Sequence, residues 1–163
     1  MASSRKKTIL RKLSQGWVAG YLPASGFLRN GQVELLALDG KTIQIPATDL
    51  KWICYVRDFS SGEVANPERL LRKTFTGRPR TEGLVLRVHL SDGDVLEGLA
   101  ANDLSLIAGS GIFLTPPDIR SNTQRIWIPT SAIAQLEVLS VIGTTKRTKD
   151  TSAKSASEQT SLF

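Results

Sequence analysis

Apolar and polar residues alternate along the chain in short runs that end at glycine, proline or Asp-Gly pairs. The clearest case is the stretch 84–98, in which Asp92-Gly93 separates two alternating runs. An Asp-Gly pair in this setting is typical of a β-hairpin, and a second one occurs at Asp39-Gly40. Similar runs cover residues 17–22, 32–38, 41–45, 50–56, 111–115, 125–130 and 134–139. The pattern therefore predicts a mostly β protein made of short strands.

Two parts of the chain carry a related pattern. Ile45-Pro46 and the residues after it align with Ile128-Pro129 and the residues after it, with apolar positions coinciding at 50/133 and 53/136. In both places a strand ends at Ile-Pro and a tight helical turn follows, because proline suits the first position of such a turn. Upstream, residues 33–36 align with 112–115, and residues 18–20 with 96–98. We therefore expect a degenerate tandem duplication of small β-barrel units over residues 14–59 and 84–143.

The first of these units has no clear counterpart of the strand 84–90, so either its barrel is open or a strand from elsewhere completes it. Residues 60–83 are expected to form a basic linker, with a short helix from Pro67 to about Phe75 that Asn66 caps. Residues 1–13 are expected to form a basic, solvated N-terminal arm. Residues 144–163, rich in Ser, Thr and Lys, are expected to be a disordered tail.

Charge and cysteine content narrow the function classes. The net charge of +6 divides into +5 for residues 1–13, +2 for residues 144–163 and −1 for the rest, so the expected body is nearly neutral. The single cysteine, Cys54, excludes an internal disulfide and fits a reducing compartment. The chain shows no secretory signal and no apolar stretch long enough to span a membrane, so we expect a cytoplasmic protein.

The second half resembles Sm-like proteins, a ring-forming RNA-binding family, and also small SH3-like β-barrels. The segment from Leu90 to Gly98 matches the Sm pattern of apolar alternation, turn glycine and second glycine, and Asn102-Asp103 falls near the family's loop aspartate. Residues 128–130 replace the basic and histidine residues that Sm-like RNA chaperones carry before the last turn. The resemblance therefore implies the fold more than RNA binding.

A closer resemblance is to a bacterial domain family of unknown function. Its Gly-Phe-Phe-Leu strand, Pro/Asp/Ser/Asn loop and Arg-led strand correspond to residues 111–114, 116–122 and 125–128 here. Ile112 stands where the family often has phenylalanine, and Thr123 where it often has a second asparagine. The family implies no activity.

Candidate catalytic groups have simpler structural explanations. Asp92, Asp94 and Glu97 are close in sequence, but Asp92-Gly93 fits a turn, and Asp94 and Glu97 alternate toward different faces of a strand. His89 is expected to point outward, without a nucleophile beside it. One cysteine and one histidine leave little for a zinc site. We therefore expect a protein that is not an enzyme and has no cofactor.

Two groups of residues are candidate binding surfaces. The first is a polar loop after two prolines, whose donors can hold phosphate or carboxylate groups: Asp118, Arg120, Ser121, Asn122, Gln124 and Arg125. The second is a set of arginines in and after the linker, which are candidate nucleic-acid contacts: Arg78, Arg80 and Arg87.

The last five residues form a third candidate. They resemble the short peptide with which bacterial replication and repair proteins bind the DNA sliding clamp. Gln159, Ser161, Leu162 and Phe163 match that pattern, while Thr160 replaces its usual leucine.

The sequence thus favours a cytoplasmic binding or adaptor module with an unidentified protein partner. An Sm-like RNA binder that assembles as a homo-oligomer and a sliding-clamp-associated protein are the alternatives.

Overall fold

The computed structural model describes residues 4–60, 62, 64–70, 72–118 and 120–143. The described chain is mostly β, as the sequence predicts. The first half contains β1 (Arg5–Lys12), β2 (Trp17–Pro23), β3 (Leu28–Arg29), β4 (Gln32–Ala37), β5 (Thr42–Pro46), the 3-10 turn η1 (Ala47–Asp49) and β6 (Leu50–Val56). The second half contains β7 (Gly83–Leu90), β8 (Val95–Ala100), the single-turn helix α1 (Ser105–Ala108), β9 (Gly111–Leu114), β10 (Thr123–Pro129), η2 (Thr130–Ala132) and β11 (Ile133–Ile142).

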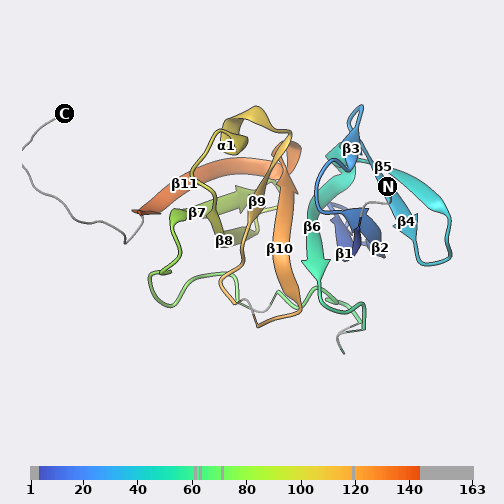
Figure 1. Cartoon of the computed structure of the whole chain (residues 1–163), viewed down its shortest axis with the longest axis horizontal. Coiled ribbons are helices and arrows are strands. Elements are labelled where there is room, and N and C mark those ends of the chain that lie inside the picture. Colours follow the sequence, from blue (N-terminus) through green and yellow to red (C-terminus); the bar gives the residue numbers. More distant parts are fainter. Residues whose placement is uncertain (1–3, 61, 63, 71, 119, 144–163) are drawn as a thin grey trace, which may run out of the picture.

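The strands form two sheets rather than closed barrels (Figure 1). The larger sheet has the order β3-β4-β2-β1-β6-β10-β9, with β5 paired to β4, and the smaller one has the order β11-β7-β8. An isolated antiparallel bridge between Leu99 and Thr115 joins β8 to β9. The expected β-rich fold and Asp-Gly hairpins are confirmed, since Gly40 and Gly93 adopt the positive φ angles of 87° and 93° that such turns require.

The β6 strand ties the two halves together. It pairs with β1 of the first half on one edge and with β10 of the second half on the other. In Figure 1, β6 and β10 lie side by side at the centre, with β1 to β5 on one side and β7, β8 and β11 on the other. Two buried clusters form the first-half core, around Leu22 and Leu35, and the second-half core, around Leu86 and Leu96. Because side chains alternate along a strand, Ile53 packs into the first-half core while Cys54 packs into the second-half core. All seven residues of β6 are buried.

Both halves show the same order of strand pairing and the same register. The order is β6-β1-β2-β4-β5 in the first half and β11-β7-β8-β9-β10 in the second. A glycine lies at the same place in each: Gly20 in β2 and Gly98 in β8. A Cβ on Gly20 would come within 2.7 Å of Leu35, and one on Gly98 within 2.8 Å of Leu114. In each half a glycine therefore lets two neighbouring strands approach closely.

The expected basic N-terminal arm is wrong for residues 5–12, which form β1 between β2 and β6. Ile9 and Leu10 are fully buried and belong to the two different cores. The strand that the first half seemed to lack is thus the basic segment. The basic residues of this segment make it look like a solvated arm in the sequence. In the structure, Lys6 and Lys7 are exposed and Arg11 pairs with a buried carboxylate, so the segment can still form a strand.

The helix expected from Pro67 to Phe75 is also wrong, since the described residues of this segment are turns and irregular chain. Arg69 has a left-handed φ of 50°, and its amide donates to the Asn66 carbonyl in a tight turn. Leu70 enters the second-half core. Tertiary contacts, not helix-capping signals, decide the conformation of this linker. Residues 144–163, expected to be disordered, lie outside the described residues.

Candidate functional site: an apolar cleft between the two halves

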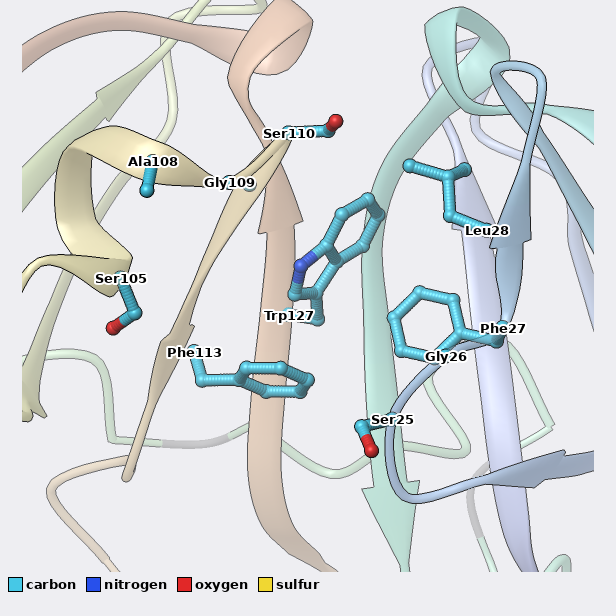
Figure 2. A pocket seen from close by; sticks show the side chains of 11 residues that line it. Ser25, Gly26, Phe27, Leu28, Ser105, Ala108, Gly109, Ser110, Phe113 and Trp127 are labelled. Carbon is cyan, nitrogen blue, oxygen red and sulfur yellow. The ribbon is translucent and has the colours of Figure 1, made fainter.

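A cleft of about 390 Å³ opens between the β2–β3 loop of the first half and the α1–β9 segment of the second (Figure 2). Its walls come from both halves, because β10 lies against β6 and so brings Trp127 toward Phe27. The lining residues are Ser25, Gly26, Phe27, Leu28, Ser105, Ala108, Gly109, Ser110, Gly111, Phe113 and Trp127. We call this feature the aromatic cleft.

Three aromatic rings form its floor. The rings of Phe27 and Trp127 meet edge to face with centroids 5.0 Å apart, and those of Phe27 and Phe113 do so at 6.3 Å. Such edge-to-face pairs are favourable contacts beyond simple burial. Trp127 and Phe27 are buried while Phe113 remains half-buried. The two buried rings are therefore held in place, and part of the Phe113 ring stays accessible from the cleft.

Gly111 is required for this arrangement. A Cβ at this position would lie 2.6 Å from the Trp127 ring and 2.5 Å from the Ile128 carbonyl oxygen. The glycine therefore lets β9 run against the indole, which fixes the Trp127 side chain at the base of the cleft.

None of the lining residues carries an ionisable side chain. Outside the lining, the Arg125 guanidinium lies 3.7 Å from the centre of the Phe113 ring. The Tyr55 ring contacts that of Phe113 with centroids 6.5 Å apart, and the Tyr55 hydroxyl donates to the Pro23 carbonyl at 2.8 Å. Burial raises the pKa of Tyr55 well above its usual value, so this hydroxyl stays a neutral donor. The cleft suits an apolar group.

The polar loop that the sequence singles out lies elsewhere and makes internal contacts. The Asn122 amide donates to the carbonyls of Asp58 and Pro67 at 2.8 and 2.7 Å, and the Ser121 hydroxyl donates to the Asp118 carbonyl at 2.8 Å. The Asn122 bonds attach the loop to Asp58 of the first half and to Pro67 of the linker. Arg120 and Gln124 are exposed, and Arg125 stacks on Phe113 as described. A binding role for this loop stays a prediction.

The candidate nucleic-acid arginines do not share one role. Arg87 pairs with Glu97 at 3.0 Å and lies 3.6 Å from Glu137. The exposed Arg78 donates to the Val141 carbonyl at 3.2 Å, and Arg80 is also exposed. His89 lies 2.8 Å from Glu137 on the same face of the small sheet. The Gln159–Phe163 segment, with its clamp-peptide pattern, lies outside the described residues.

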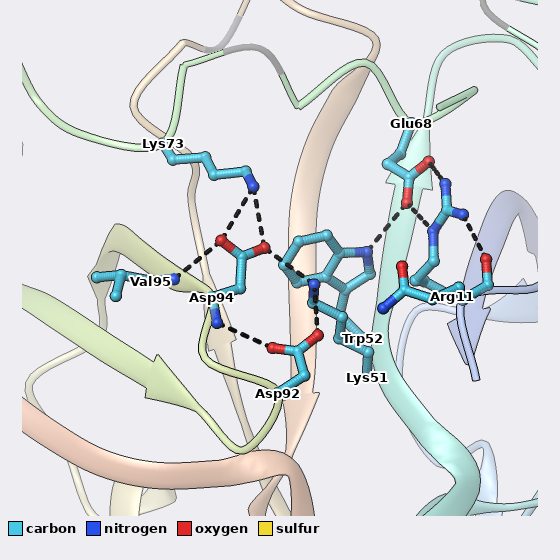
Figure 3. A network of polar contacts seen from close by, with 9 residues as sticks. Arg11, Lys51, Trp52, Glu68, Lys73, Asp92, Asp94 and Val95 are labelled. Carbon is cyan, nitrogen blue, oxygen red and sulfur yellow. Dashed lines mark hydrogen bonds and ion pairs between the residues drawn. The ribbon is translucent and has the colours of Figure 1, made fainter. Parts of the chain in front are cut away.

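A buried ion pair anchors the linker to the first half (Figure 3). The fully buried Glu68 carboxylate accepts from Arg11 Nε at 2.9 Å, Arg11 Nη2 at 2.6 Å and Trp52 Nε1 at 3.1 Å. Burial by itself would raise the pKa of Glu68, but these donors outweigh it and hold that pKa below its usual value. The bidentate geometry and the indole donor satisfy the carboxylate without a ligand.

A second cluster joins the linker to the β7–β8 hairpin. Lys51 Nζ lies 2.9 Å from both Asp92 Oδ2 and Asp94 Oδ2, and Lys73 Nζ lies 2.9 Å from Asp94 Oδ2. Burial opposes the charged form of both aspartates, but the lysines prevail and lower the pKa of each. For Lys51, burial lowers the pKa and the two carboxylates raise it, with a net rise.

Glu97 completes the attachment, since it accepts from the Phe75 amide at 2.9 Å and pairs with Arg87. The carboxylates that looked like acid–base candidates in the sequence are therefore each bound to a cation or amide of this chain. Among the described residues there is no group of three His, Cys, Asp or Glu side chains that could hold a metal ion. Burial raises the pKa of the Cys54 thiol well above its usual value.

The sequence gives little sign of the aromatic cleft. Its three rings are widely spaced in the chain, and only the register of β6 with β10 brings Phe27 and Trp127 together. The usable signal was the Gly111–Leu114 segment, whose glycine and phenylalanine both turn out to line the cleft.

A comparison with protein families matches residues 4–140 to a family of unknown function, DUF6982. The chain belongs to the DUF6982 family. The match begins before β1 and ends within β11, so this family spans both halves and the linker. No curated protein and no solved structure matches this DUF6982 member. Within the described part of the chain, no helix has the length and apolar character needed to cross a bilayer.

Proposed function

We propose that this DUF6982 protein is a non-enzymatic, cytoplasmic binding or adaptor module. Its ligand is an extended segment of a protein partner that inserts a bulky apolar side chain into the aromatic cleft. The observation that carries the proposal is the cleft itself: about 390 Å³, floored by Phe27, Phe113 and Trp127 and free of ionisable lining groups. Rigid aromatic walls with a polar rim are typical of sites that bind an anchoring side chain.

The rim supplies what a peptide backbone needs. Ser25, Ser105 and Ser110 surround the apolar floor, and each is exposed. Figure 2 shows Ser25 and Ser105 at opposite sides of the Phe113 ring and Ser110 beyond the indole of Trp127. Their hydroxyls can donate to and accept from a peptide main chain while the apolar side chain is buried.

The polar clusters support a scaffold role for the remaining charges. Glu68, Asp92, Asp94 and Glu97 are engaged with Arg11, Lys51, Lys73 and Arg87, and these pairs join the linker to both halves. The carboxylates thus contribute to positioning the halves, and the cleft lies between those halves. A buried, reduced Cys54 is compatible with a reducing compartment.

We also propose that the two halves arose by duplication of one unit. The support is the common strand order, the equivalent glycines Gly20 and Gly98, and the 3-10 turns that follow Pro46 and Pro129. In such a pair, the cleft lies where the last strand of one unit meets the fourth strand of the next.

The proposal is tested by selecting peptides and then blocking the cleft. A random ten-residue peptide library displayed on phage is selected against the full chain, and the enriched peptides are labelled for fluorescence anisotropy. Ala108→Trp places an indole in the cleft from its α1 rim, while Ile107→Trp places one on the same helix outside the lining, where Ile107 is 82% exposed.

Enriched peptides are expected to carry Trp, Phe or Leu, and to bind the wild type and Ile107→Trp alike. Binding to Ala108→Trp is expected to fall at least tenfold. Equal binding to both variants would contradict the proposal. So would a protein that selects no peptide and instead binds single-stranded RNA with a salt dependence that shows phosphate contacts.

A further inference from the structure

The β11 strand has an edge that no other described strand covers. It pairs with β7 on one side and with no strand on the other. Four of its large apolar side chains are exposed: Leu136 at 40%, Val138 at 57%, Leu139 at 41% and Val141 at 56%. A long apolar edge of this kind promotes pairing with another strand.

The first half shows how the equivalent edge is covered. Its last strand, β6, is buried at every residue, because β10 pairs along its second edge and Trp127 lies opposite Ile53. Trp127 thereby joins the first-half core. Leu136 occupies the position in β11 that Ile53 occupies in β6, and it has no such cover.

The apolar side chains of β11 continue the second-half core to the edge of the sheet. Leu136 lies opposite Val88 and Val138 opposite Leu86 in the register with β7, and both of these partners are fully buried. Paired residues share a face of the sheet, so Leu136 and Val138 form the open margin of the second-half core.

The edge lacks the side chains with which proteins most directly prevent edge-to-edge pairing, although its register with β7 shifts at Ile133/Gln135 and Val138/Ser140. The segment from Ile133 to Ile142 contains no lysine, arginine or proline, and its one charged residue, Glu137, is held by His89 at 2.8 Å. In the described part of the chain, β11 is also a longer strand than β3 and β5, two edge strands of the large sheet.

β5 of another copy is the first occupant to consider, because it corresponds to β10. Its chemistry does not fit. Gln44 stands where β10 has Trp127, and Glu34 of the neighbouring β4 stands where β9 has Phe113. These polar side chains would have to cover Leu136 and Val138. The strand that matches the apolar margin is β11 itself.

We propose that two copies of this chain pair through their β11 edges, antiparallel about a two-fold axis, into a six-stranded sheet of order β8-β7-β11-β11-β7-β8. The two-fold axis places the same face of both strands on one side, so the Leu136 and Val138 side chains of each copy cover those of the other. An isologous contact needs a self-complementary patch, and the Leu136 and Val138 side chains of this strand provide one.

Mass measurement on the full chain is the first test. Light scattering during size-exclusion chromatography, over a series from low to high micromolar, is expected to show twice the 17.8 kDa chain mass at the upper end. Val138→Lys is expected to raise the dimer dissociation constant at least tenfold. The control Val64→Lys, at an 86% exposed linker position, is expected to leave it unchanged. Urea unfolding of both variants verifies that each is folded.

Disulfide cross-linking then fixes the geometry. The native Cys54 is buried, so single cysteines at Leu136, Val138 and Ser140 report on β11. Directly opposed residues of an antiparallel pair lie within disulfide range, and at least one of these variants is expected to give a dimer band. The double variant Thr42→Cys/Val138→Cys tests the β11–β5 arrangement. A monomer at every concentration, or a ladder of higher oligomers that needs both cysteines of the double variant, would overturn the proposal.

Discussion

Glu68 shows how much one side chain determines in this protein. It is fully buried as a carboxylate, and it links the linker to β1 through Arg11 and to β6 through Trp52. Its main-chain carbonyl also accepts from the Thr123 hydroxyl at 2.6 Å, which adds β10 to the same junction. Four segments therefore meet at one residue. A substitution that leaves the Glu68 charge without a partner should lower the free energy of unfolding.

Arg11→Met is expected to destabilise the fold by about 3–5 kcal/mol, because removing one partner of a buried pair leaves an uncompensated charge. Arg5→Met, at an exposed position of the same strand, is expected to stay within about 0.5 kcal/mol of the wild type. The measurement is the free energy of unfolding from urea titration at neutral pH. Equal stabilities of the two variants would contradict the role given to the Glu68 pair.

The same groups predict the pH dependence of stability. The pKa values of Glu68, Asp92 and Asp94 are lowered in the folded state from ordinary values of 4.5, 3.8 and 3.8. Above those values the unfolded chain also holds charged carboxylates, so the stabilisation is fully present at neutral pH. It is lost as the pH falls below about 4 and through the lower folded-state pKa values, because the unfolded state then binds more protons. The pKa of Lys51 is raised from its ordinary value of 10.5, so its contribution to stability is fully present below that pH and is lost as the pH rises through the higher folded-state pKa.

Urea titrations between pH 3 and pH 8 measure how the free energy of unfolding changes with pH, which is the slope compared below. Asp94→Asn removes a carboxylate that two lysines hold, and its stability is expected to fall less on acidification than that of the wild type. Asp39→Asn, at the exposed turn before Gly40, serves as the control and is expected to keep the wild-type slope. An unchanged slope in Asp94→Asn would contradict this account.

At the scale of the elements, Gly20 and Gly98 allow close contact between neighbouring strands and so determine how the hairpins pack. Gly98→Ala is expected to destabilise by about 1–3 kcal/mol, since the new methyl group would lie 2.8 Å from Leu114 in a packed core. Gly16→Ala is the matched control, because nothing lies within 4 Å of its Cβ position. Thermal unfolding followed by circular dichroism compares the two variants. Similar midpoints would contradict the claim that the close packing of β8 on β9 contributes to stability.

Most of the strands could be predicted from alternation and Asp-Gly turns, since a half-buried strand has period two whatever surrounds it. β1 could not, because Ile9 and Leu10 are adjacent and enter different cores, which breaks the alternation. The helix expected at Pro67 failed for a related reason. Glu68 looks like a helix-start acid in sequence, but in the structure it is the buried partner of Arg11, a residue far away in the chain.

The candidate site was harder to predict than the fold. The loop 118–125 is polar and looked available, yet Asn122 and Ser121 make internal hydrogen bonds. The aromatic cleft depends on β10 pairing with β6, a contact between strands of different halves. Local patterns carry no information about such a pairing, and so the lining residues could not be grouped from sequence.

At the scale of the whole molecule, the shared sheet makes the halves interdependent. Trp127 of the second half belongs to the first-half core, and Ile9 of the first half belongs to the second-half core. The full chain is therefore expected to unfold in one cooperative transition. Tryptophan fluorescence and far-ultraviolet circular dichroism should give coincident urea curves. Two separated transitions would mean that the halves are independent domains.

The central claim, that the aromatic cleft is a ligand site, is tested most directly by nuclear magnetic resonance. A peptide selected on the full chain is titrated into ¹⁵N-labelled protein, and amide and indole resonances are followed. The account predicts that the largest shifts fall on the Trp127 indole and on the amides of Ser105 and residues 109–111. Shifts confined to β11 or to the exposed residues 5–7 of β1, with the Trp127 indole unmoved, would contradict it.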